Sequence, residues 1–106
     1  MSDADKHPAA PLPPPTFTFL AVSLRTQAEI QLGLLDFGGE DKPEPNLPLA
    51  RHTIDMMAML LEKTRGNLTI EEQRLLENSL TELRFRYVQV AEDMAKAQAA
   101  GQASGA

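Results

Sequence analysis

Residues 69–94 decide the fold of this chain and read TIEEQRLLENSLTELRFRYVQVAEDM. Apolar side chains recur in this stretch at alternating steps of four and three residues, the heptad spacing of a helix that packs along one face. They are Leu76, Leu80, Leu83, Tyr87, Val90 and Met94. Thr69 and Glu72 have the spacing of a capping box at a helix start. We therefore predict a long amphipathic helix from Thr69 to about residue 97.

A sharp reversal precedes this helix. The segment EKTRGN contains Gly66, which suits the left-handed conformation just past a helix end, and Lys63 and Arg65, whose charges suit the negative end of the helix dipole. Upstream, we expect a helix from Pro48, a good first-turn residue, to about Arg65. Its apolar residues cover most of its circumference, which predicts a central helix contacted from several sides: Ile54, Met56, Met57, Met59, Leu60 and Leu61. The two helices form a predicted hairpin.

Another helical pattern runs from about Thr18 to Asp36 and stops at Gly38-Gly39. One face is marked by Phe17, Leu20, Leu24, Ala28 and Leu35 and is widened by Val22, Ile30, Leu32 and Leu34. The loop GGEDKPEPNLP follows, and its length lets the next helix pack in either direction. No stretch alternates like a strand, so we predict an all-α, three-helix bundle-like domain.

Composition separates this domain from two tails. All eight prolines lie before residue 49, and five of them fall within the first fifteen residues. We expect residues 1–15 to be a disordered proline-rich tail. Residues 98–106 contain only small and polar side chains with nothing to bury, so we expect a second disordered tail there. The predicted three-helix domain is then 16–97.

Overall composition excludes several classes of function. The 106 residues fit one small domain. The absence of cysteine excludes disulfides, thiolate metal sites and a cysteine nucleophile. A net charge of -5 argues against a general nucleic-acid or anionic-membrane binder. The N-terminus lacks the pattern of a secretory signal, and polar residues interrupt the apolar stretch Phe17–Phe37, so we expect a cytoplasmic protein that does not span a membrane.

No catalytic or metal-binding constellation can be assembled from the remaining residues. His52 and Asp55 share a helix face, but a metal site needs more ligands, and the other histidine, His7, lies in the N-terminal tail. Each candidate hydroxyl nucleophile has a simpler role as a cap or helix-surface residue: Ser23, Thr26, Thr53, Thr64, Thr69, Ser79 and Thr81. We therefore expect no enzymatic activity, no cofactor and no metal.

Basic residues support an alternative function. Lys63, Arg65 and Arg74 could contact a phosphate near the positive N-terminal end of the last helix. With Arg84 and Arg86, they would make the chain a phosphate or nucleic-acid contact protein. Helix capping and a solvated surface explain the same residues, so our leading interpretation has no nucleic-acid partner.

The unequal lengths of the hairpin helices favour self-association. At about 1.5 Å per residue the last helix is roughly 42 Å long, whereas its partner reaches roughly 25 Å. The uncovered end carries Tyr87, Val88, Val90 and Met94, which we predict to be the interface of a homodimer. The next candidate is the face formed by Phe17, Leu24 and Leu35. The leading interpretation is thus a helical protein-interaction module, which would also have another protein partner that the residues do not identify.

Residues 17–88 also resemble a known family. The similarity lies in FTFLAVSLRTQAEIQLG, in LARHTIDMMAMLLEKTRGNLTIEEQRLL and in LTELRFRYV. They are similar to a small bacterial family known only as a domain of unknown function, DUF1844. The resemblance implies a cytoplasmic, all-helical bacterial protein with no assigned activity, substrate, cofactor or catalytic residue.

Overall fold

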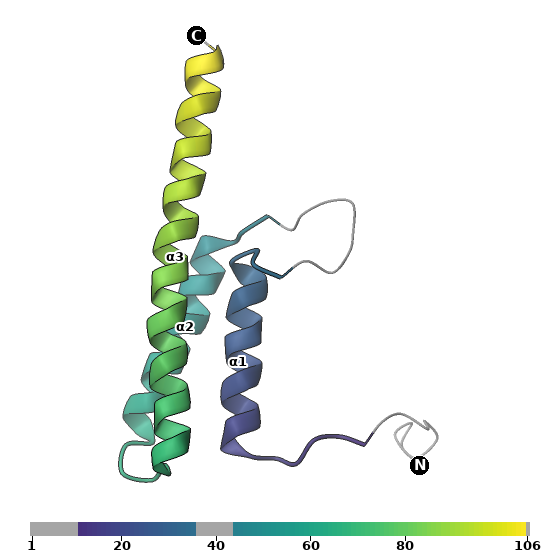
Figure 1. Cartoon of the computed structure of the whole chain (residues 1–106), viewed down its shortest axis with the longest axis vertical. Helices are drawn as coiled ribbons and strands as arrows, with labels where there is room; N and C mark the ends of the chain where they lie inside the picture. The colour runs from purple at the N-terminus through teal and green to yellow at the C-terminus, as the bar shows by residue number, and fades with distance from the viewer. Residues whose placement is uncertain (1–10, 36–43, 106) are drawn as a thin grey trace.

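The structure is a computed structural model that describes residues 11–35 and 44–105, with side chains up to residue 101. Within these ranges it contains α1 (Phe17–Gln31), α2 (Leu47–Lys63) and α3 (Ile70–Gly105). Figure 1 shows that consecutive helices run in opposite directions, so α1 and α3 point the same way. The prediction of an all-α, three-helix arrangement is confirmed.

The first helix ends earlier than its apolar pattern indicated. Gly33 has a φ of 73°. Its N–H donates to the carbonyl of Ile30 at 2.9 Å, and the N–H of Leu34 donates to the carbonyl of Glu29 at 2.9 Å. This pair of bonds is a Schellman motif, in which a left-handed glycine terminates the helix. The expected continuation to Asp36 was therefore wrong.

The start of α2 is held beside the end of α1. Asn46 caps α2, because its side-chain oxygen accepts the N–H of Leu49 at 3.1 Å. The N–H of Asn46 donates to the carbonyl of Gln31 at 2.7 Å. The buried Thr53 hydroxyl also donates to Oε1 of Gln31, at 2.6 Å, although we expected this threonine on the helix surface. These contacts hold the start of α2 beside the end of α1, so the two helices are antiparallel. The length of the loop between them had left both directions possible for α2.

The turn between α2 and α3 depends on local backbone chemistry. Gly66 has a φ of 89°. The N–H of Glu72 donates to Oγ1 of Thr69 at 3.1 Å, and the N–H of Thr69 donates to Oε1 of Glu72 at 2.9 Å. These reciprocal bonds form a capping box that satisfies two donors at the helix start. The hairpin geometry therefore depends on Gly66, Thr69 and Glu72.

Substituting Gly66 with alanine is expected to lower the free energy of unfolding by about 1–2 kcal/mol, because a Cβ atom is disfavoured in the left-handed region. Apart from Gly66 and its two chain neighbours, no heavy atom lies within 4 Å of the position that the added Cβ would take, so the cost comes from the backbone itself. Gly101 is the matched control, since it also has open space but lies within α3. Urea unfolding of Gly66→Ala and Gly101→Ala at one protein concentration tests this, and equal stabilities would contradict it.

The core lies where the three helices meet. Its buried apolar residues are Ala21, Ala28, Leu32, Ala50, Ile54, Met57, Leu76, Leu80 and Leu83. Both buried residues of α1 are alanines, Ala21 and Ala28, which allow its backbone to approach the other helices closely. Ser79 of α3 is also buried, against our expectation of a surface position, and its Oγ has no hydrogen-bond partner among the described residues.

The last helix extends far beyond the other two (Figure 1). It continues past residue 97, where we placed the domain boundary, to Gly105. Alanine has the highest helix propensity, so the alanine-rich segment continues the helix although its side chains are exposed up to residue 101. Of the predicted N-terminal tail, residues 11–15 are exposed and residues 1–10 lie outside the described ranges. No helix within those ranges has the length and apolar character of a membrane span.

Candidate functional site

The first helix is apolar on two opposite sides. Ala21 and Ala28 face the core, whereas Phe19, Val22 and Ile30 are 47, 41 and 40 % exposed. Successive residues of an α-helix are about 100° apart, which places Phe19 and Ile30 about half a turn away from the two alanines. Only one of the two apolar sides is used by the bundle.

The exposed side is a defined surface, which we call the outer face of α1. It consists of Phe19, Val22, Ser23, Thr26 and Ile30. These side chains line a shallow hollow of about 440 Å³ together with Gln27 and Gln31. The bulky residues Phe19 and Ile30 lie towards its two ends, and the small residues lie between them. The outer face is therefore shaped like a packing surface for another helix.

The residues that form the outer face are uncharged. The Ser23 hydroxyl donates to the carbonyl of Phe19 at 2.7 Å, so it is satisfied within its own helix. The charged residues of α1 are Arg25 and Glu29, whose Nε and Oε2 atoms are 3.7 Å apart. This pair leaves α1 without net charge in a chain whose net charge is -5. The outer face and the helix that carries it therefore have no net charge.

Apolar side chains are also exposed on α2. Leu49 and Met56 are exposed and lie four residues before and three residues after Thr53, which contacts α1. This spacing puts them on the α1 side of α2. Met59 is exposed as well, so Met56 and Met59 are not covered, although α2 lies against both α1 and α3 as predicted. Within the bundle, α2 is covered only on the sides where α1 and α3 lie against it.

The structure divides the interface residues predicted on α3 between different surroundings. Tyr87 and Val90 are partly buried and pack against the core. Val88 is exposed and lines a groove of about 230 Å³ with Ile54 and Tyr87 between α2 and α3. Met94 is also exposed but lines a separate hollow of about 330 Å³ near the end of α1. Val88 does not belong to the heptad pattern that contains Tyr87, Val90 and Met94. The four predicted interface residues therefore do not form one surface.

The alternative face on α1 is already occupied within the monomer. Phe17 and Leu24 are partly buried against the core, and Leu35 is half-buried. Sequence reasoning missed the outer face, because it treated Val22 and Ile30 as a widening of the core-facing side. One signal for it was present in the sequence, since only two of the fifteen residues in α1 are charged.

The three basic residues near the α2–α3 turn lie among carboxylates. Nη2 of Arg65 is 3.9 Å from Oε2 of Glu62. Arg65 lines one hollow and Arg74 lines another, and Glu77 lines both. Lys63 is exposed in the last turn of α2. This mixture of charges provides no concentrated positive patch.

The two other basic candidates lie on different sides of α3. Arg84 and Arg86 are two residues apart, which corresponds to about 200° around the helix. Nε of Arg86 is 3.2 Å from Oε1 of Glu82, whereas Arg84 lines the α2–α3 groove with Arg51 and Asp55. The spacing of these arginines therefore separates them in space instead of gathering them.

The polar residues of α2 do not build a metal site. His52 and Asp55 are both exposed, and Oδ2 of Asp55 is 3.9 Å from Nε of Arg51. Within residues 11–35 and 44–101, no group of three or more histidine, aspartate or glutamate side chains is arranged to hold a metal ion.

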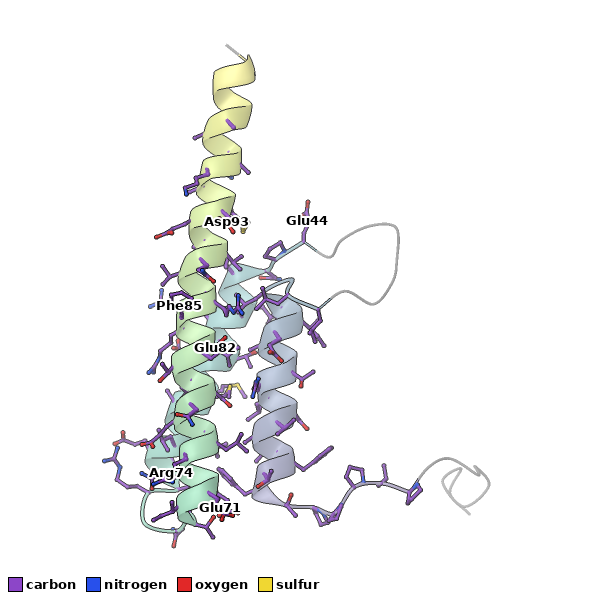
Figure 2. All side chains as sticks on the ribbon, in the orientation of Figure 1. Glu44, Glu71, Arg74, Glu82, Phe85 and Asp93 are labelled. Carbon is purple, nitrogen blue, oxygen red and sulfur yellow. The ribbon has the colours of Figure 1, made fainter. Side chains whose placement is uncertain are left out.

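Phe85 is another exposed residue that sequence reasoning did not select, and it lies on the side of α3 away from α1 (Figure 2).

Comparison with known proteins returns one family. The family model described as "Domain of unknown function (DUF1844)" matches residues 14–89. This range includes all of α1 and α2 and most of the part of α3 that packs on them. No curated protein and no solved structure matches the chain.

Proposed function

Since the chain belongs to the DUF1844 family, whose description assigns no activity, we propose that it is a non-enzymatic helical interaction module that binds a second copy of itself through the outer face of α1. The observation that carries this proposal is the pair of opposite apolar sides on α1, of which the bundle covers one. Contiguous exposed apolar surface marks interaction sites in water-soluble proteins.

The energetics favour covering this face. Removing apolar surface from water contributes about 25 cal/mol per Å², so burying three large side chains in each copy is a substantial gain. A domain of about 80 residues buries only roughly 60–65 % of its unfolded surface and is marginal alone. Association therefore stabilises both copies.

The hydroxyl groups support a role without catalysis. Ser23, Thr64 and Thr81 each donate to a backbone carbonyl of their own helix, at 2.7, 2.7 and 3.1 Å. A hydroxyl nucleophile instead needs a base within hydrogen-bond reach. These three hydroxyl groups therefore support a binding role in preference to a catalytic one.

Light scattering of the full chain tests the proposal. We expect a mass of twice 11.6 kDa at micromolar concentration and a mass of 11.6 kDa for Ile30→Glu, because association would bury a carboxylate without a partner. Phe85→Glu is the matched control, since it places the same charge on an exposed apolar residue of α3 and should leave the dimer intact. Circular dichroism should show all three proteins folded.

Other results would contradict the proposal in different ways. A wild-type mass that stays at 11.6 kDa as concentration rises would contradict self-association. A dimer that survives Ile30→Glu but dissociates in the double variant Val90→Glu/Met94→Glu would move the interface to the projecting part of α3. Retention of a monomeric wild type on nucleic acid at low salt would favour the alternative function.

A further inference from the structure

We infer that the two copies pair their α1 helices antiparallel, about a twofold axis that passes between Leu24 and Arg25. This inference rests on the proposed self-association and adds its register. In a twofold interface, residue i of one copy meets residue j of the other, and j meets i. Every twofold axis meets this requirement, but an axis between Leu24 and Arg25 pairs Phe19 with Ile30, Ser23 with Thr26 and Val22 with Gln27, all of which line the hollow.

The first argument is the distribution of side-chain size. Phe19 and Ile30 are the bulky members of the outer face at its two ends, and Ser23 and Thr26 are the small members between them. Both pairs have the same midpoint, between residues 24 and 25. An antiparallel twofold axis at this midpoint places Phe19 of each copy opposite Ile30 of the other. A parallel pair needs no shared midpoint, because each residue then meets its own copy.

The second argument is how closely the helices can approach. Interaxial distances of packed helices are about 8–10 Å and depend on the side chains at the contact. Ser23 and Thr26 of both copies meet around the axis, where the helices are closest. Phe19 and Ile30 then fill the space on either side as the helices diverge, which accounts for the hollow between these bulky residues.

The dipole of α1 also favours the antiparallel arrangement. A helix carries a partial positive charge at its N-terminal end and a partial negative charge at its C-terminal end. An antiparallel pair places opposite ends side by side, whereas a parallel pair places like ends side by side.

Disulfide crosslinking tests the register, because the chain contains no cysteine of its own. Phe19→Cys and Ile30→Cys are oxidised separately and as an equal mixture that has first been allowed to exchange subunits. We expect crosslinked dimer on a denaturing gel only from the mixture. In an antiparallel pair, two copies of either position are about 16 Å apart along the helices, too far for a disulfide. Crosslinking of each variant alone would overturn the antiparallel arrangement.

Thr26→Cys separates failure of the register from failure of the interface. Its two copies lie near the axis, so this variant should crosslink with itself. A wild type of twice 11.6 kDa whose Thr26→Cys variant does not crosslink would overturn both the register and the proposed face. A monomeric wild type would instead contradict the proposed function itself.

A second measurement leaves the outer face unchanged. Thr18 is exposed and lies near the start of α1, outside that face. A spin label on Thr18→Cys should show two labels at least about 20 Å apart, because the antiparallel register separates the two positions by thirteen residues along the helices. A distance near 10 Å would indicate parallel helices and overturn the inference.

Discussion

Replacing Leu83 with alanine is expected to lower the free energy of unfolding by about 2–5 kcal/mol, because the lost side chain leaves a cavity that the surrounding helices fill only in part. Leu83 is 1 % exposed and belongs to the cluster where α3 packs against α1 and α2. The free energy of unfolding of a small domain is only about 5–15 kcal/mol. The variant should therefore be largely unfolded at urea concentrations well below the unfolding midpoint of the wild type.

Phe85→Ala is the matched control for this prediction. Phe85 lies two residues further along the same helix and is 58 % exposed. Substitutions at exposed positions usually change stability by about 0.5 kcal/mol or less. Urea titrations of both variants at one protein concentration, followed by helical circular dichroism, measure the difference. Equal losses would show that α3 does not present its Leu83 side to the core.

Enlarging Ala28 to leucine is expected to destabilise the bundle by about 1–3 kcal/mol or more, because a tightly packed core resists added volume. Ala28 is 0 % exposed on the side of α1 that approaches the other helices. Leucine is nearly as good a helix former as alanine, so helix propensity does not account for such a loss. The added volume would push α1 away from α2 and weaken the hydrogen bond between Thr53 and Gln31.

Ala95→Leu provides the comparison at an exposed position of α3. We expect its unfolding midpoint to stay close to that of the wild type, while the midpoint of Ala28→Leu falls. Thermal unfolding of both variants at one concentration is sufficient. An Ala28→Leu protein as stable as Ala95→Leu would mean that α1 packs loosely and that its alanine side is not a close contact.

Several parts of the fold followed from short-range patterns. Leu76, Leu80 and Leu83 repeat at heptad spacing, and their burial needs only a helix and a partner for its apolar side. Thr69 and Glu72 form their reciprocal bonds within a single turn. Such features depend on neighbours three or four residues away, so they can be predicted from the sequence.

The candidate site could not be predicted in the same way. Apolar residues surround α1, and periodicity alone does not say which side of such a helix faces the core. The predicted core-facing side included Ala28, which is buried, but also Leu20, which the structure exposes. Ala21 is buried beside Ala28, because helices that pack closely need small side chains at their closest approach. Phe19 and Ile30 are left outside as a consequence.

By itself, the sequence determined three helices, the capped start of α3 at Thr69 and the glycine turn at Gly66, since each depends on interactions within about one turn of chain. Only the tertiary structure decided that α1 lies antiparallel to α2. The Asn46 N–H reaches the carbonyl of Gln31, and residues this far apart in the chain meet only when the helices pack. The same packing determined which side of α1 remains open to a partner.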